Sequence, residues 1–176
     1  MKGITSIALL ALLLAGSLFR NAVWDTEGGI WEDTIRKSPR KARAYNELGL
    51  HELNAGRNEY AYRLLSRSLE LNPYQGEVYV NLALALEHLD RIDEAIKVYE
   101  QAISFQPDDP TPYYNLGVLA YRVRHDRNRA LTYFLQARDR NPEEPDVHHF
   151  LSRIYAEKGE ENRSREEETL YRQLKP

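Results

Sequence analysis

A pattern that recurs about every 34 residues constrains the fold of this 176-residue chain more than any other feature of its sequence. Between Gly76 and Pro107, apolar residues at helical spacing are followed by a polar break, a second apolar set and a closing proline. Two short amphipathic helices joined by a tight turn produce this arrangement. The same residue types return on both sides, at Tyr45, Tyr79 and Tyr113, at Leu48, Leu82 and Leu116, at Ala61, Ala95 and Ala130, and at Pro73, Pro107 and Pro142.

The order of these positions is an aromatic residue before leucine and a small residue, then alanine before an aromatic residue, and a final proline. In this order the sequence resembles the tetratricopeptide repeat family, over roughly residues 38–142 with a weaker echo beyond. The resemblance implies an all-α fold, a right-handed α-solenoid of helix-turn-helix repeats that bury their apolar faces by stacking on one another. We expect this solenoid to follow one N-terminal hydrophobic helix.

Two details of the repeat division are specific predictions. Gly28 and Gly29 are expected to break the segment before a helix at 30–37, in which Trp31 takes an aromatic packing position. The third repeat is one residue longer than the second, and the extra residue is expected in its turn, around Arg124–Arg127. The predicted boundaries are 1–24 for a membrane or signal segment, 25–41 for an N-terminal cap, 42–75, 76–109 and 110–144 for three repeats, and 145–176 for a degenerate fourth repeat that forms a C-terminal cap.

Packing between the helices is expected to depend on small residues and on a weakened last helix. Ala95 should lie where the two helices of the central repeat meet, because an alanine there lets paired helices approach closely. In the last helix, about Glu161 to Leu174, serine and glutamate replace the pattern alanine and aromatic residue. Its expected apolar stripe is Leu170, Tyr171 and Leu174, which suits a solvated cap.

The segment from Ile4 to Phe19 contains no charged residue and is long enough for roughly 24 Å of helix. It predicts either a retained membrane anchor that extends past Arg20 to Trp24, or a cleaved signal peptide. Both alternatives send the rest of the chain across a membrane. We therefore expect a single-pass membrane protein whose repeats face the extracytoplasmic side, which is the periplasm if the source is bacterial.

The junction between this segment and the first repeat carries a second resemblance. Trp24, Trp31, Ser38-Pro39 and Gly49 resemble the place where the last membrane helix enters the repeats in transmembrane-and-tetratricopeptide-repeat mannosyltransferases and related membrane proteins. The resemblance covers only that tail, so no catalytic residue is carried over. It implies an alternative function, an accessory subunit of a membrane glycosyltransferase assembly, beside the main expectation of a membrane-tethered protein-interaction scaffold.

Composition and motifs argue against several other classes. The net charge of −3 makes a nucleic-acid partner a poor expectation, and the absence of cysteine excludes disulfides and sulfur-based zinc sites. No phosphate loop, nucleophile elbow or His-Glu metal motif occurs, so we expect no enzyme activity and no cofactor. The side chains of His148 and His149 point about 100° apart on a helix, so we expect these histidines to pack against neighbouring residues and not to bind a metal ion.

The first helices of successive repeats are expected to line a concave groove for a protein or peptide partner. Asn81 and Asn115 occupy the slot at which an asparagine lines the groove in long arrays such as that of O-linked N-acetylglucosamine transferase. An amide donates and accepts, so it can pair with a peptide backbone; alternatively, both side chains satisfy neighbouring helices. Glu47 and Phe150 interrupt this ladder. The predicted groove residues are Asn46, Val80, Asn81, Tyr114, Asn115, His88 and Arg122.

Five basic residues precede the first repeat. They are expected either to contact lipid head groups or an acidic partner, or to form a solvated face. They are Arg36, Lys37, Arg40, Lys41 and Arg43, which we call the basic cluster.

Overall fold

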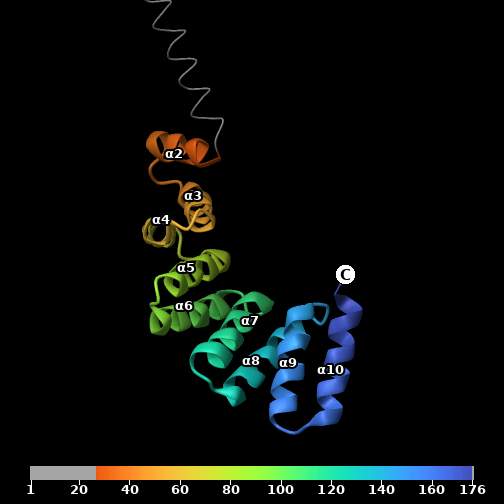
Figure 1. The fold of residues 1–176 in the computed structure, drawn as a ribbon. Helices are drawn as coiled ribbons and strands as arrows, with labels where there is room; N and C mark the ends of the chain where they lie inside the picture. The colour runs from red at the N-terminus through yellow and green to blue at the C-terminus, as the bar shows by residue number, and fades with distance from the viewer. Residues whose placement is uncertain (1–26, 176) are drawn as a thin grey trace, which may run out of the picture. The chain divides into compact units, whose positions relative to one another are not determined.

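The computed structural model describes residues 27–175, and in that range all regular secondary structure is helical, without a strand (Figure 1). The predicted all-α fold of helix pairs is thus confirmed for this range, whereas the predicted N-terminal hydrophobic helix lies outside the described residues. The elements are α2 (Glu27–Lys37), α3 (Ala42–Asn54), α4 (Asn58–Leu71), α5 (Gly76–His88), α6 (Ile92–Phe105), α7 (Pro110–Val118), the π-helical segment η1 (Leu119–Val123), α8 (Arg127–Arg140), α9 (Pro145–Glu157) and α10 (Glu161–Leu174).

These helices divide into two compact units, one up to Pro73 with α2 to α4, and one from Tyr74 onward with α5 to α10. Helices α3, α5, α7 and α9 begin at the residues where the sequence pattern begins its four repeats. The division into repeats itself stays a prediction.

The first unit is held together by close approach of its helices. A Cβ atom on Gly49 of α3 would lie 2.7 Å from Cγ of Leu65 in α4, so this contact requires glycine. The Ser68 hydroxyl donates a hydrogen bond to the carbonyl oxygen of Ala42 at 2.9 Å. The predicted break at Gly28 and Gly29 was wrong, because both residues lie inside α2. Gly28 is buried there, and a Cβ atom on it would lie 3.0 Å from the His51 ring.

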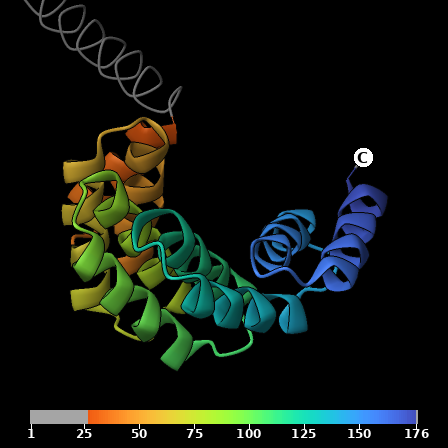
Figure 2. The same cartoon turned by 60° about the horizontal axis from the view of Figure 1, so that its bottom comes forward.

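The second unit contains three helix pairs, and α9 and α10 lie side by side in both views (Figure 1, Figure 2). Its core contains the fully buried rings of Tyr99 and Phe134 together with the alanines of the pattern, and Ala95 is 0% exposed. Phe134 stacks on Phe150 of the next pair with ring centroids 4.7 Å apart. The aromatic side chain of one pair thereby packs in the core of the following pair. Stacking of pairs in this way buries apolar surface that a single pair would leave exposed.

Each helix pair is joined by three residues, and the middle one is left-handed. Glycine occupies this position at Gly56 and Gly159, with φ of 74° and 75°. Asp90 and His125 occupy it in the other two turns, with φ of 59° and 53°. A side chain at such a φ is sterically unfavourable, so the two turns of the middle pairs carry a strain that the outer two avoid.

The extra residue of the third repeat lies in its first helix and not in its turn, which corrects the sequence prediction. Helix α7 and η1, with nine and five residues, are together one residue longer than the 13-residue α5. The Arg124 amide donates to the Leu119 carbonyl at 3.0 Å, a bond that spans five residues. The helix thus absorbs the insertion as a π-helical turn, and the three-residue connection keeps its length.

A histidine takes the place of the pattern tyrosine in the last pair. The hydroxyl of Tyr113 donates to the Pro107 carbonyl at 3.1 Å, and Nε2 of His148 lies 2.8 Å from the corresponding Pro142 carbonyl. His148 is 2% exposed, which confirms packing as its role. Its Nδ1 lies 2.6 Å from Oε2 of Glu167, the buried residue of α10.

This buried carboxylate also corrects the expected apolar stripe of the last helix. Of that stripe, Leu170 is 41% exposed, whereas Tyr171 and Leu174 are half-buried as expected. The buried residue of the helix is Glu167, whose Oε1 accepts a hydrogen bond from Arg138 at 2.9 Å. The last helix therefore docks through a charged network that reaches back to α8.

Candidate functional site

The predicted groove residues differ widely in exposure. Asn46 is buried at 7% exposure, whereas His88 and Arg122 are exposed. Val80 is half-buried and packs against the core cluster of Ala83, Tyr99, Leu116 and Leu119. Tyr114 is half-buried, with its ring edge-on to Phe134 and Phe150.

Asn115 takes part in a hydrogen-bond network inside the second unit. The Tyr99 hydroxyl donates to Oε1 of Glu87 at 2.5 Å. Burial, the Glu87 charge and this bond raise the pKa of Tyr99, while a hydrogen bond from the Asn115 side chain acts in the opposite direction. Burial likewise raises the pKa of Glu87. Satisfying a neighbouring helix is thus one role of Asn115, and the groove role of Asn81 and Asn115 stays a prediction.

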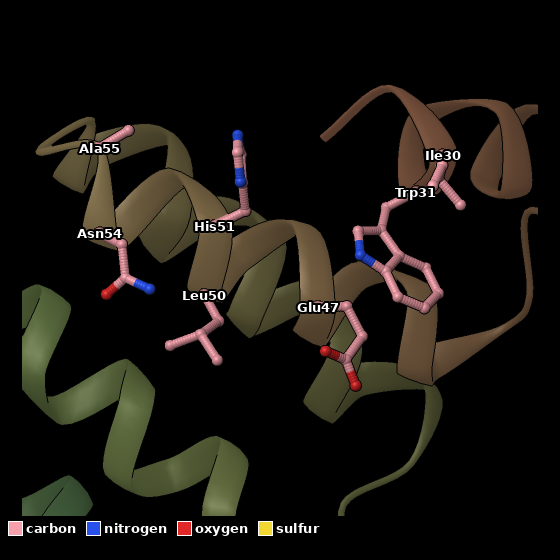
Figure 3. A pocket seen from close by; sticks show the side chains of 7 residues that line it. All are labelled: Ile30, Trp31, Glu47, Leu50, His51, Asn54 and Ala55. Atoms are coloured by element: carbon pink, nitrogen blue, oxygen red, sulfur yellow. The ribbon is translucent and has the colours of Figure 1, made fainter. Parts of the chain in front are cut away.

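The first unit has a hollow of about 600 Å³ on the side of α2 and α3 (Figure 3). The Trp31 indole extends from α2 toward Glu47 of α3, with Leu50 and His51 further along the helix. Glu47 accepts a long hydrogen bond of 3.4 Å from Arg43. The sequence pattern missed this hollow, because it depends on how α2 lies against α3, with Gly28 next to the His51 ring. The lining residues are Ile30, Trp31, Glu47, Leu50, His51, Asn54 and Ala55.

A smaller hollow of about 250 Å³ in the second unit contains Tyr114 of the predicted groove. Glu144 and Asp146 line it on the α9 side. Burial raises the pKa of Tyr114, the charge of Asp146 adds to this effect, and the charge of Arg122 opposes it. The face of α7 that carries Tyr114 therefore has an acidic end near Asp146 and a basic end at Arg122.

At that basic end, arginines lie over aromatic rings. The Arg122 guanidinium carbon is 5.2 Å from the Phe150 ring centroid, and that of Arg153 is 5.7 Å from the Tyr121 ring centroid. The Tyr121 and Phe150 rings are edge-on to each other, 5.6 Å apart. We call these four residues the arginine–aromatic cluster. Sequence analysis placed Arg122 in the groove and Phe150 at a slot of the asparagine ladder. It missed Tyr121 and Arg153, because their contacts join η1 to α9 across about 30 residues of chain.

One carboxylate borders the arginine–aromatic cluster. Glu157 accepts hydrogen bonds from the Tyr121 hydroxyl at 2.5 Å and from Arg127 at 2.8 Å. These two hydrogen bonds, first that of Tyr121, lower the pKa of Glu157. Glu157 is thus already engaged by the residues around it.

The basic cluster before the first repeat is partly neutralised within the chain. Arg36 and Lys37 each lie 2.5 Å from an oxygen of Asp33, and their hydrogen bonds, first that of Lys37, lower the pKa of Asp33 to about 2. Arg40 and Lys41 are exposed. Among residues 27–175, no group of three or more histidine or carboxylate side chains is placed to hold a metal ion.

Comparison with known proteins identifies repeats in the second half of the chain. A TPR repeat model matches residues 88–123, and a tetratricopeptide repeat model matches residues 114–176. Tetratricopeptide repeat-containing protein trd-1 of Caenorhabditis elegans is 35% identical over 61% of this chain and 14% of its own length. BBSome complex member BBS4 of Bos taurus is 33% identical over 51% of this chain and 17% of its own length.

A third relative bears on the junction that sequence analysis singled out. Protein O-mannosyl-transferase TMTC1 of Homo sapiens is 26% identical over 91% of this chain and 18% of its own length. This chain thus spans less than a fifth of each of these relatives.

Solved structures share the fold at low sequence identity. A crystal structure of MamA superimposes with a TM-score of 0.73 at 19% identity, over 82% of this chain and 84% of that one. The structure of YrrB, described as a TPR protein with an unusual peptide-binding site, has a TM-score of 0.66 at 18% identity, over 94% of this chain and 83% of that one. Both show the same helix-pair architecture.

Proposed function

This chain belongs to the tetratricopeptide repeat family, and on that premise we propose that it is a scaffold whose first helices bind a partner protein or peptide. One observation carries the proposal. Each unit has a hollow beside a first helix, in which aromatic, apolar and polar side chains converge: Trp31 with Glu47 in one unit, and Tyr114 with Asp146 in the other. Concave surfaces of this mixed character suit side chains of a partner.

The names of similar proteins support an assembly role. BBS4 is named as a member of the BBSome complex, and another relative, of Schizosaccharomyces pombe, is anaphase-promoting complex subunit 3. YrrB is described as having a peptide-binding site. These descriptions name members of protein complexes and a peptide-binding protein, and the proposed scaffold would likewise bind a protein or a peptide.

We propose further that the segment 1–24 tethers the scaffold to a membrane, with the repeats on the extracytoplasmic side. The uncharged run from Ile4 to Phe19 supports this proposal. Within the described range of 27–175, none of the helices has the length and apolar character to cross a membrane. Intact mass of the protein purified from membranes tests the tether, and a product that lacks the first fifteen or so residues would instead support a cleaved signal peptide.

A second function is favoured by one comparison. The match to Protein O-mannosyl-transferase TMTC1 extends over 91% of this chain but only 18% of that enzyme. It supports an accessory subunit of a membrane glycosyltransferase assembly, in which this chain supplies repeats and a separate chain supplies the reaction. A glycosyltransferase recovered as the crosslinked partner would favour this function over a general scaffold.

Site-specific photo-crosslinking tests the groove. A photoreactive residue at position 81, on first helix α5, should give a defined product with a partner. The same residue at position 101, an exposed site on second helix α6, serves as the matched control. A product from position 101 alone would overturn the groove assignment, and no product at either position would argue against the scaffold.

Replacement of the two asparagines tests the same surface quantitatively. One net hydrogen bond is worth roughly 0.5–1.5 kcal/mol, so Asn81→Ala with Asn115→Ala should weaken partner binding about tenfold. Recovery must be compared at a temperature at which both proteins are folded. Unchanged recovery with a lower melting temperature would assign both amides to helix packing.

A further inference from the structure

Three aromatic side chains of the second unit form an exposed cluster where helix α6 ends. The Phe105 ring stacks on the Tyr79 ring with centroids 5.0 Å apart, and it lies edge-on to the Tyr74 ring at 6.1 Å. Phe105 is 39% exposed and Tyr74 is 81% exposed, so both rings present much of their surface to solvent. We call Tyr74, Tyr79 and Phe105 the exposed aromatic cluster.

The corresponding place in the third repeat is occupied by a cation of the chain itself. Helix α6 ends at Phe105 and helix α8 ends at Arg140, so these two residues share the last position of their helices. Tyr79 and Tyr113 likewise share one position of the pattern. The Arg140 guanidinium carbon lies 3.9 Å from the Tyr113 ring centroid, whereas in the second repeat a phenyl ring covers the tyrosine. The second repeat thus presents two stacked rings where the third repeat has a stack of ring and guanidinium.

Carboxylates line a hollow of about 560 Å³ beside the Phe105 ring. Glu77 and Asp108 are exposed there, and Asp109 accepts a hydrogen bond from the Thr111 amide at 2.9 Å. In the part of the chain that the structure describes, no basic nitrogen lies within the 4.0 Å of a salt bridge from any of these three carboxylates. The carbonyl end of α6 adds partial negative charge, which favours a nearby cation.

Arg140 borders this hollow at Pro107, and its guanidinium is already engaged. It donates to the Pro107 carbonyl at 2.5 Å and to the Gln136 carbonyl at 2.8 Å, and it covers the Tyr113 ring. Three carboxylates therefore stand against one guanidinium that faces carbonyl oxygens. A net negative charge results next to the Phe105 ring.

An aromatic face beside carboxylates that have no ion-pair partner suits a guanidinium. The ring face attracts a cation, and a carboxylate accepts two parallel N–H bonds from the same planar group. A guanidinium is more weakly hydrated than an ammonium and stacks flat on a ring, so both contacts favour arginine over lysine. Arg140 on Tyr113 shows a guanidinium over a ring within the same unit.

We propose that the exposed aromatic cluster and the carboxylates of Glu77 and Asp108 bind an arginine side chain of another protein. The guanidinium lies on the Phe105 ring, and the two carboxylates accept hydrogen bonds from its in-plane N–H groups. This site shares no lining residue with the two hollows of the proposed function, so it is a second docking surface, at the connection between two repeats. The inference goes beyond the proposed function and does not depend on it.

Peptide binding to the full chain tests this inference. The probe is a fluorescent peptide of glycine and serine that contains three arginines, and its matched controls carry lysine or the neutral analogue citrulline at those positions. Anisotropy should show binding of the arginine peptide, weakened by added salt, with the lysine peptide several-fold weaker and the citrulline peptide unbound. Equal affinities for the arginine and lysine peptides would overturn the assignment to a guanidinium.

Variants of the chain test the carboxylates and the ring separately. Glu77→Gln with Asp108→Asn should lower the affinity for the arginine peptide about tenfold, because charge-assisted hydrogen bonds are lost. Phe105→Leu keeps an apolar side chain but removes the ring face, and about a threefold loss is expected at this exposed position. Glu59→Gln with Glu166→Gln removes the same charge from exposed positions elsewhere and should retain the affinity within about twofold.

Equal weakening by the two double variants, or an unchanged affinity in Phe105→Leu, would overturn the proposal. Circular-dichroism melts establish that each variant is folded. Self-association of the chain that Arg40→Gln with Lys41→Gln abolishes would assign the site to the basic cluster of a second copy, and would overturn the assignment to another protein. Because the crosslinking test at position 81 uses a different surface, its outcome neither supports nor replaces the peptide measurement, and the two proposals fail independently.

Discussion

Two helix pairs of the second unit have the same form and are held together by different interactions. In the α5–α6 pair, the second helix buries Ala95, Tyr99 and Ala102, each at most 1% exposed. In the α9–α10 pair, the buried residue of the second helix is Glu167, which contacts a histidine of α9 and an arginine of α8. One helix pair geometry therefore accommodates either apolar burial or a buried ionic network.

This difference determines how the stability of each pair responds to a substitution. Apolar burial is non-directional and scales with the area removed from water, so its loss is graded. A buried ionic network depends on every member, because removing one leaves the others desolvated and unpaired. The following predictions test this contrast, from the largest expected effect to the smallest.

Glu167→Ala should have the largest effect. It leaves the buried His148 without its carboxylate, whereas Arg138, which is 33% exposed, keeps Asp139 at 3.5 Å. Removal of one partner of a buried ion pair costs up to about 3–5 kcal/mol. Urea unfolding measures the loss of free energy, and hydrogen exchange should show opening of α10. Glu166→Ala, at the exposed neighbouring position, is the control. Equal losses in the two variants would show that the network does not hold the last helix.

Ala95→Leu tests the apolar pair. Ala95 is 0% exposed, so the larger side chain should overpack the contact and lower the free energy of unfolding by about 1–3 kcal/mol. Ala156→Leu makes the same change at an exposed position of helix α9 and should be nearly neutral. If thermal melts show similar stabilities for the two variants, tight packing does not distinguish the α5–α6 pair.

In the turns of the two middle pairs, a substitution is expected to raise the free energy of unfolding, by a smaller amount. His125 has a φ of 53°, where a side chain costs about 1–2 kcal/mol, partly offset by the entropy that glycine loses on folding. His125→Gly should therefore stabilise the chain by about 0.5–1 kcal/mol. Gly159→Ala, at the left-handed position of the last turn with φ of 75°, should destabilise it. Melting temperatures that move in the same direction for both variants would contradict this account.

The smallest expected effects are two opposite pH dependences. Burial raises the pKa of Glu87 above 4.5, so its contribution to stability is present below that pH and lost as the pH rises through the raised value. Hydrogen bonds lower the pKa of Glu157, so its contribution is present above pH 4.5 and lost as the pH falls through the lowered value. Glu87→Gln should remove the first dependence and Glu157→Gln the second.

Urea unfolding of each variant and of the wild type, from about pH 3 to pH 7, measures both dependences. Parallel changes in the two variants would show that the two carboxyl groups share one environment. Opposite changes would show that the stabilities of the two pairs also differ in their dependence on pH.

Local spacing was enough to predict where the first helices α3, α5, α7 and α9 begin. Tyr79 and Tyr113 occupy the same position of the pattern, 34 residues apart, and Gly56 and Gly159 occupy the same left-handed turn position. The proline at Pro110 and the Asp109 side chain, which accepts from the Thr111 amide, begin α7 as the sequence indicates. Such signals act over a few residues, so the sequence alone carries them.

Contacts between pairs were decided by the tertiary structure. The extra residue before His125 was evident from spacing, but whether helix or turn absorbs it depends on the packing around α7, which retains a three-residue turn. Glu167 acquired its role from partners 19 and 29 residues earlier, and the arginine–aromatic cluster joins η1 to α9. A periodic pattern records which face of a helix is apolar, whereas the partner of a charged side chain is chosen by geometry between helices.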